Sequence, residues 1–276
     1  MKTWLITGCS SGFGRNLAKT LLEVGEQVVV TARKPETLSD FSEQYPQTAL
    51  LHRLDVTDNE SIKETVASAI ERFGKIDVLV NNAGYCLRGA VEECTEKEIY
   101  DQFNTNFFGS VRMIQAVLPF MRKAHSGCII NYSSIAALET SPGSAFYGAT
   151  KAAVESLSDG LRKEVGPFGI KVMVVEPGPF KTDFFNRSIG ISMNRIDDYA
   201  DTAGRRKVRT SDLTELGMKW CDMRKSCELI IDLAERSNTP HHILLGSMAV
   251  KIGEQYAVDR LKEVGRWESE SMSLDA

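Results

Sequence analysis

The chain has 276 residues, 42% of them hydrophobic and 25% charged, which is typical of a globular protein built as one α/β unit. Its formal net charge of −4 argues against a nucleic-acid partner or an anionic membrane surface. No apolar run approaches the ~20 residues that a membrane-spanning helix needs, so we predict no membrane span.

Further features concern the cellular compartment. The chain opens directly on a predicted strand, so no signal peptide is expected. The six cysteines form no C-x-x-C pair, which indicates free thiols in a cytoplasmic protein. The four histidines do not cluster with cysteines or carboxylates along the sequence. His241 and His242 are adjacent and would point to opposite faces of a strand, so no metal site is predicted.

Short runs rich in Val, Ile and Leu alternate with longer helical patterns. The apolar runs predict strands over residues 3–7, 27–32, 49–54, 78–81, 128–133, 171–176 and 242–245. Helices are predicted over residues 12–24, 59–73, 96–123 and 145–166. This alternation predicts one Rossmann-type α/β domain over residues 1–276. It would hold a doubly wound, seven-stranded parallel sheet with helices on both faces.

Residues 180–225 interrupt this rhythm because they are too long for a simple connection. They carry several aromatic and aliphatic side chains, Phe180 and Phe184 among them, followed by a charged stretch at 205–209. We interpret them as a lid over the ligand site. The alternative is an insertion that only packs on the surface.

A glycine-rich turn follows the first strand and opens the first helix. Gly8 permits a tight turn, Gly12 lets the backbone approach a phosphate, and Gly14 allows the helix to pack closely on the strand. The helix N-terminus would then face a pyrophosphate. This arrangement predicts a dinucleotide site.

The end of the second strand indicates which dinucleotide. An acidic residue that would bond the ribose 2′-hydroxyl of NAD is lacking from residues 31–34, and Arg33 stands there instead. Arg33 can hold a 2′-phosphate through charge-assisted hydrogen bonds, and Ser11 can add a hydroxyl. We therefore predict that NADP(H) is preferred, with NAD(H) possible. The alternative is that Arg33 is a solvated loop charge.

Three downstream side chains supply acid–base chemistry. Lys151 follows Tyr147 by four residues and thus shares its helical face. Its positive charge is expected to lower the pKa of the Tyr147 phenol. Ser134, at the end of the fifth predicted strand, can hydrogen-bond the substrate oxygen. Together with a dinucleotide, these groups are suited to moving a hydride to or from a carbonyl carbon.

Over residues 3–183 the chain resembles a short-chain dehydrogenase/reductase. The resemblance rests on T-G-x-x-x-G-x-G at 7–14, D-V at 55–56, N-N-A-G at 81–84, the asparagine in 106–109, Ser134, Y-x-x-x-K at 147–151 and P-G-P-x-x-T at 177–182. Within the family, residues 7–12, 31–33 and 175–178 resemble the 17β-hydroxysteroid and retinol dehydrogenase-like branch. A steroid substrate is not carried over from that likeness.

The resemblance implies a catalytic tetrad. Tyr147 would be the acid/base, Ser134 would polarise the substrate oxygen, and Lys151 would also bind the nicotinamide ribose. Asn106 would hold a water that links Lys151 to solvent; Asn104 is a nearby competitor, but Phe107-Phe108-Gly109 after Asn106 fits the family pattern. The cofactor is expected to contact Gly8, Ser10, Ser11, Gly12, Phe13, Gly14, Arg33, Asp55, Val56, Asn82, Ala83, Gly84, Tyr147, Lys151, Pro177, Gly178 and Thr182.

The substrate is expected to be a small-molecule carbonyl or alcohol. It would meet Ser134, Tyr147, Tyr85, Phe180 and Phe184, whose largely apolar character suits a hydrophobic ketone, aldehyde or secondary alcohol. The alternative is that several of these side chains only pack the lid on the core.

The resemblance also implies assembly through the helices over 96–123 and 145–166. Apolar residues on both exceed the needs of a core face, among them Phe103, Phe107, Val111, Ile114 and Val117. A homodimer or homotetramer is therefore predicted. Two alternatives for function stay open: a 3-oxoacyl-thioester reductase, and a non-catalytic NADP(H)-sensing protein.

Overall fold

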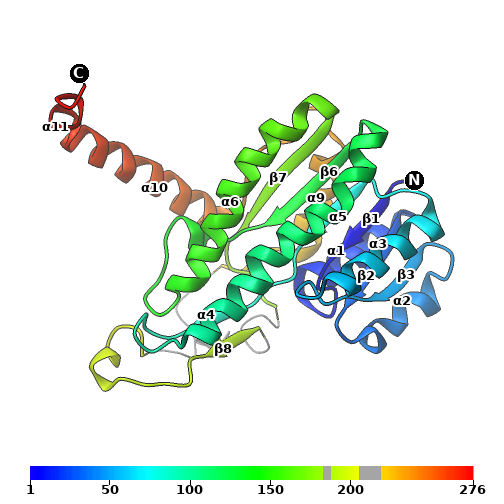
Figure 1. Cartoon of the computed structure of the whole chain (residues 1–276), viewed down its shortest axis with the longest axis horizontal. Helices are drawn as coiled ribbons and strands as arrows, with labels where there is room; N and C mark the ends of the chain where they lie inside the picture. Colours follow the sequence, from blue (N-terminus) through cyan, green and yellow to red (C-terminus); the bar gives the residue numbers. More distant parts are fainter. Residues whose placement is uncertain (183–187, 205–218, 276) are drawn as a thin grey trace.

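The computed structural model describes residues 1–182, 188–204 and 219–275. A seven-stranded sheet in the order β3-β2-β1-β4-β6-β7-β9, with every neighbouring pair parallel, forms its centre (Figure 1). Its strands are β1 (Thr3–Ile6), β2 (Gln27–Ala32), β3 (Ala49–Arg53), β4 (Val78–Asn81), β6 (Gly127–Tyr132), β7 (Ile170–Pro177) and β9 (His242–Leu245). The predicted doubly wound sheet is confirmed, with strand ends that differ by at most one residue.

Helices cover both faces of this sheet. The α-helices of the described residues are α1 (Gly12–Glu23), α2 (Ser39–Gln44), α3 (Asn59–Phe73), α4 (Glu96–Phe103), α5 (Gly109–Ala124), α6 (Ala145–Val165), α9 (Met223–Glu235), α10 (Ser247–Arg266) and α11 (Glu268–Met272). The predicted helix over 96–123 is interrupted by a π-helical turn, Asn104–Phe108, between α4 and α5. Helices α2, α9, α10 and α11 lie outside the predicted helices.

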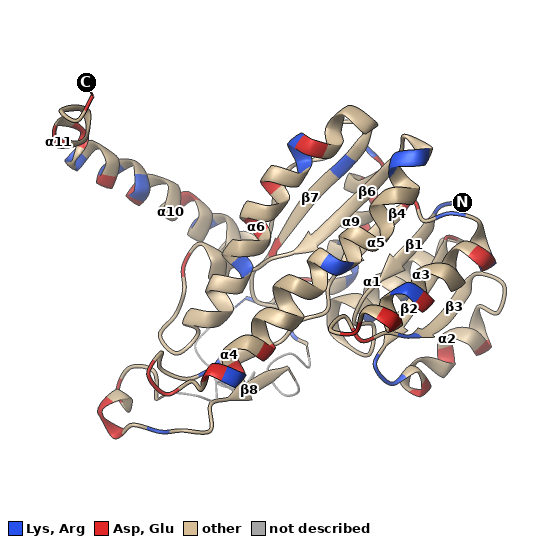
Figure 2. Cartoon of the chain, in the orientation of Figure 1, with Lys and Arg blue, Asp and Glu red and all other residues tan. Residues whose placement is uncertain are grey.

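The strand side chains alternate between two cores. Trp4 and Ile6 pack on one face with residues of α1 and α9, whereas Leu5 packs on the other face with residues of α3, α5 and α6. Both sets are fully buried, which is why the strands are apolar throughout. Charged side chains of both signs are dispersed over the outer helices and along α10, and few lie on the strands (Figure 2).

Local signals fix the helix ends. The Asp58 side chain accepts a hydrogen bond from the Glu60 amide at the start of α3, and Gly74 ends that helix in the left-handed region. Thr95 and Glu98 form a capping box at the start of α4. These caps fix where α3 and α4 begin and where α3 ends.

Two further features lie outside the main sheet. Strands β5 (Cys86–Arg88) and β8 (Ile189–Ile191) pair in parallel and join the loop after β4 to the described part of the predicted lid. Helix α10 runs outward from the body of the molecule (Figure 1), and Ala249 is its one buried residue. No helix of the described residues is long and apolar enough to cross a membrane. All six cysteines are free thiols.

Candidate active site

A cavity of about 1000 Å³ lies at the carboxyl ends of the sheet strands. The predicted site residues that line it are Gly8, Ser10, Ser11, Gly12, Phe13, Arg33, Asp55, Val56, Asn82, Ala83, Gly84, Tyr85, Ser134, Tyr147, Lys151, Pro177, Gly178, Phe180 and Thr182. The topology thus brings together residues from six strand ends, at the edge where ligands bind in open α/β sheets.

The glycine turn between β1 and α1 has the conformation that a phosphate cradle requires. Gly8 and Gly12 have φ of 74° and 57°, which glycine adopts without strain. A Cβ atom on Gly14 would lie 2.6 Å from Gly8 O, so only glycine allows α1 to start this close to β1. The backbone therefore fits the pyrophosphate of a dinucleotide.

Asn82 acts on this turn from the neighbouring strand end. Its Nδ2 donates to Thr7 O at 2.9 Å and Gly8 O at 3.1 Å, while the Thr7 hydroxyl accepts from the backbone amides of Asn82 and Ala83 at 3.0 Å each. These bonds lock the end of β1 to the end of β4. The Asn82 side chain supports the turn from behind, a role that the sequence analysis did not foresee.

Arg33 and Asp55 line the same end of the cavity, after β2 and β3. Arg33 is exposed. Burial would raise the pKa of Asp55, but hydrogen bonds from the Thr57 amide and hydroxyl, with the charges of Arg33 and Arg53, outweigh it and lower that pKa. Asp55 is therefore ionised and holds the Thr57 turn, and Arg33 keeps its guanidinium near the cavity wall.

The π-helical turn Asn104–Phe108 carries Asn106. Its buried side chain accepts from the Tyr85 amide at 3.0 Å and donates to Tyr85 O at 2.8 Å and Thr150 Oγ1 at 3.1 Å. Asn104, the competitor, lies half-buried in the cavity wall, and its backbone oxygen accepts from Arg112. Single π-turns inside helices often mark functional positions.

Tyr147 and Lys151 both come from the first turns of α6, and Ser134 comes from the end of β6. Tyr147 is hydrogen-bonded to the Ser134 hydroxyl. Lys151 Nζ lies 5.7 Å from the Tyr147 ring centroid and donates to Tyr132 O at 2.8 Å. The Ser134 Oγ also accepts from the Ala136 amide at 3.1 Å, which fixes its orientation.

Burial dominates the electrostatics of these side chains. It raises the pKa of the Tyr147 phenol well above its ordinary value, against the opposing hydrogen bond with Ser134. Burial also lowers the pKa of Lys151 to about 8, although the Glu155 carboxylate raises it. The Tyr147 pKa is thus raised in this structure, against the expectation that the Lys151 charge would lower it, because burial outweighs the hydrogen bond that favours the phenolate.

The far end of the cavity holds the remaining predicted contacts. Thr182 lies across from the glycine turn, since a Cβ on Gly12 would stand 4.0 Å from its Cβ. Phe180 is buried against Phe13, with ring centroids 4.5 Å apart, and so belongs to both the core and the cavity wall. Phe184 lies outside the described residues. Further apolar wall comes from Ile135, Ile189 and Met248.

Several polar residues around the site escaped the sequence analysis. Asn81 Nδ2 donates to Asn131 Oδ1, and Asn131 Nδ2 donates to Ser158 Oγ, both at 2.9 Å, which ties β4, β6 and α6 together. His242 lies between the carboxylates of Glu176 and Asp159, a cluster that spacing along the sequence does not show because its members come from three different elements. For Ser158, the sequence offers a signal in its position seven residues, or two helical turns, after Lys151, which places both residues on the same face of the helix.

The model of the family described as short chain dehydrogenase matches residues 2–189. The chain belongs to this family. It is accordingly an oxidoreductase of the kind that interconverts CH–OH and carbonyl groups.

Relatives in sequence and structure agree with this assignment. A 3-ketodihydrosphingosine reductase from Bacteroides thetaiotaomicron is 43% identical over 245 residues, covering 88% of this chain and 87% of that protein. A short-chain dehydrogenase from Streptomyces avermitilis superposes with a TM-score of 0.91 at 40% identity, covering 100% of both chains. ElxO with NADP bound gives a TM-score of 0.73 at 30% identity, covering 88% of this chain and 96% of that one.

Proposed function

We propose that this short-chain dehydrogenase is an NADPH-dependent reductase of a hydrophobic ketone or aldehyde, with Tyr147 as the proton donor. The hydrogen-bonded pair of Tyr147 and Ser134, in a cavity that continues to the glycine turn, carries the proposal. The bound cofactor supplies the hydride, and Tyr147 supplies the proton. The Tyr147 phenol holds its proton at neutral pH, which is the state that a proton donor in carbonyl reduction needs.

The other residues orient this step. The Ser134 hydroxyl would hydrogen-bond the substrate carbonyl oxygen beside Tyr147, and Lys151, which Tyr132 O positions, would hold the nicotinamide ribose. Asn106 fixes the loop at Tyr85, and it would hold the water that links Lys151 to solvent. Arg33, with Ser11, supports a 2′-phosphate, and the NADP of ElxO favours the same cofactor here, with NADH as the weaker alternative.

We further propose a substrate with a long apolar chain. The Bacteroides thetaiotaomicron reductase suggests 3-ketodihydrosphingosine as the first compound to assay. The apolar walls at Phe180, Ile135, Ile189 and Met248 suit such a chain. A 3-oxoacyl-thioester reductase has no specific contact in its favour, and the 17β-hydroxysteroid and retinol dehydrogenase-like branch stays a prediction.

The test is NADPH oxidation by the purified protein with 3-ketodihydrosphingosine and a panel of hydrophobic ketones. Tyr147→Phe should lower kcat by about 10²–10⁴-fold and leave the NADPH dissociation constant unchanged. A wild-type protein inactive on the whole panel would refute the proposed function. Activity that survives in Tyr147→Phe would refute the assigned proton donor alone.

We propose a homodimer or homotetramer formed through α4, α5 and α6. Ile114 and Val117, predicted as surplus apolar residues, are buried in the core of the chain and are not available to a partner. Phe108 is 47% exposed and Phe120 is 41% exposed on the same helical segment. Light scattering should give a dimer or tetramer mass, and a monomer mass at working concentration would refute the assembly.

A further inference from the structure

Helix α6 carries five ionisable side chains at four-residue spacing: Tyr147, Lys151, Glu155, Asp159 and Lys163. They share one helical face, because residues four apart are neighbours on a helix. Tyr147 and Lys151 line the cavity, whereas Asp159 is exposed. Glu155 stands between these two environments, one turn beyond the catalytic lysine, and the mechanism above leaves it without a role.

Glu155 joins the helix to the strand end that bears the catalytic serine. The Ser133 hydroxyl donates to Glu155 Oε1 at 2.5 Å, and the same hydroxyl lies 3.4 Å from Lys151 O. Ser133 directly precedes Ser134, and its backbone amide is fixed by Val175 O on β7. The Glu155 carboxylate therefore clamps β6 to α6 at the point where Ser134 and Tyr147 meet.

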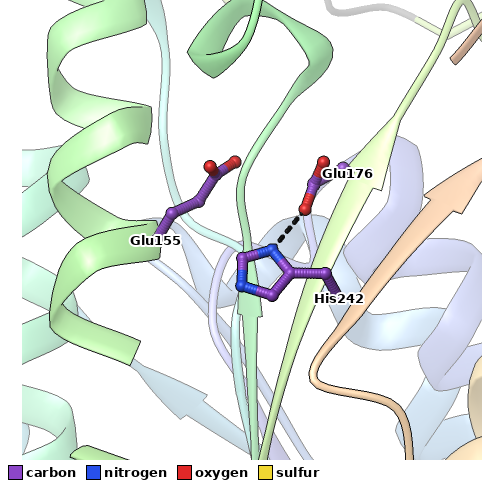
Figure 3. A group of neighbouring side chains, drawn as sticks. All are labelled: Glu155, Glu176 and His242. Carbon is purple, nitrogen blue, oxygen red and sulfur yellow. Dashed lines mark hydrogen bonds and ion pairs between the residues drawn. The ribbon is translucent and has the colours of Figure 1, made fainter. Parts of the chain in front are cut away.

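The far side of Glu155 faces a charged group from two other strands. Figure 3 shows Glu155 from α6 and Glu176 from β7 converging on the imidazole of His242 from β9. His242 Nδ1 lies 2.5 Å from Glu176 Oε1, and Nε2 lies 3.3 Å from Asp159 Oδ1. These bonds raise the pKa of His242 to about 9, so a positive imidazolium bridges two carboxylates at neutral pH.

Carboxylates outnumber cations in this cluster even when Lys151 is counted. Three carboxylates, those of Glu155, Glu176 and Asp159, face one imidazolium. Burial, with the charges of Glu176 and Asp159, raises the pKa of Glu155 to about 7. The Lys151 ammonium is the cation on the other side of Glu155, and the Glu155 charge opposes the effect of burial on that lysine.

We propose that Glu155 is a positioning residue for hydride transfer, which clamps Ser133 beside the catalytic serine and keeps the buried Lys151 in its charged form. This inference rests on the proposed reductase function. Glu155 acts here in two ways: its carboxylate accepts a hydrogen bond from Ser133, and its negative charge stabilises the Lys151 ammonium. The two parts can be removed separately.

The experiment is the pH dependence of kcat for carbonyl reduction in four proteins. Glu155→Gln keeps an acceptor for Ser133 but loses the charge, so Lys151 loses its proton more easily. The alkaline limb of the profile should therefore move to lower pH by about one unit. Ser133→Ala loses the clamp and keeps the charge, so kcat should fall without a shift of that limb.

Asp159→Asn is the matched control, because it removes an acidic charge from the same helix and cluster without touching Ser133. The alkaline limb of its kcat profile should lie at the same pH as in wild type. The NADPH dissociation constant of each variant, from fluorescence titration, should stay within about twofold of wild type and shows that the variant is folded.

Three outcomes would overturn the inference. If Glu155→Gln has the kcat and the alkaline limb of wild type, the proposed effect of the Glu155 charge on Lys151 is refuted, while the proposed function stands. An equal shift in Asp159→Asn would show a general charge effect. A wild-type profile that changes on treatment with EDTA would replace the proposal by a metal held by Glu155, Glu176 and His242. A wild type that reduces no carbonyl compound would instead remove the proposed function, and this inference with it.

Discussion

Replacement of Gly14 by alanine tests how closely the first helix must approach the first strand. A Cβ at this position would lie 2.6 Å from both Gly8 O and Asn82 Nδ2, whereas unstrained contacts need about 3.5 Å. The turn must therefore open by about 1 Å. Such overpacking costs about 1–3 kcal/mol, and the better helix propensity of alanine returns at most about 1 kcal/mol.

The opening acts on the atoms that shape the phosphate cradle. Asn82 Nδ2 holds both Thr7 O and Gly8 O, so its displacement loosens the whole turn. We expect the free energy of unfolding of Gly14→Ala to fall by about 1–2 kcal/mol. We also expect its NADPH dissociation constant to rise about tenfold, which corresponds to about 1.4 kcal/mol of binding energy.

Urea unfolding and a fluorescence titration with NADPH measure the two quantities. Gly160→Ala is the matched control, because Gly160 lies inside helix α6 and a Cβ there would meet nothing within 4 Å. That variant should gain about 1 kcal/mol of stability and bind NADPH like wild type. Equal stability and NADPH affinity in Gly14→Ala and wild type would refute the steric reasoning.

Three more predictions follow from other parts of the structure. Arg33→Asp should shift preference from NADPH toward NADH by placing a negative charge near the 2′-phosphate; an unchanged ratio of the two dissociation constants would remove Arg33 from that site. The pKa of His242 is raised to about 9, chiefly by its hydrogen bond to Glu176, so its stabilising contribution is complete below its unfolded pKa of about 6.5 and is lost as pH rises through 9. Urea unfolding from pH 6 to 10 should show this loss in wild type and not in His242→Gln. Glu93 is fully buried and accepts from the amide of Ile196 at 2.9 Å, so Glu93→Ala should destabilise the protein by about 1–3 kcal/mol and raise the substrate KM without changing NADPH affinity.

The main sheet was predictable because most of its strands are apolar on both faces. That pattern depends only on burial between two helical layers, and it marks strands such as Val78–Asn81 without knowledge of their neighbours. The two short strands β5 and β8 were not predictable in the same way. Each has three residues, and each becomes a strand only through pairing with a segment about a hundred residues away.

The candidate site likewise has some parts that local sequence predicts and other parts that only the folded chain brings together. Tyr147 and Lys151 are four residues apart on one helix, so local spacing predicts that they meet. The contacts of Asn106 with Tyr85 depend on a π-turn that no local pattern announces. The cluster at His242 is assembled from α6, β7 and β9, and the burial that reverses the expected pKa shift of Tyr147 exists only in the folded chain.

The parallel pairing of β5 with β8 has a consequence for anyone who wishes to change what this enzyme reduces. The segment beyond β7 is anchored to the segment beyond β4 through this ladder and through the bond of the Met193 amide to Glu98. A loop transplanted from another family member to positions 180–225 would therefore face a β5 strand that is not matched to it. Exchanging residues 85–98 in the same chimera would transfer β5 and Glu98 together with β8 and Met193, and leave the strands β1, β2 and β3 unchanged.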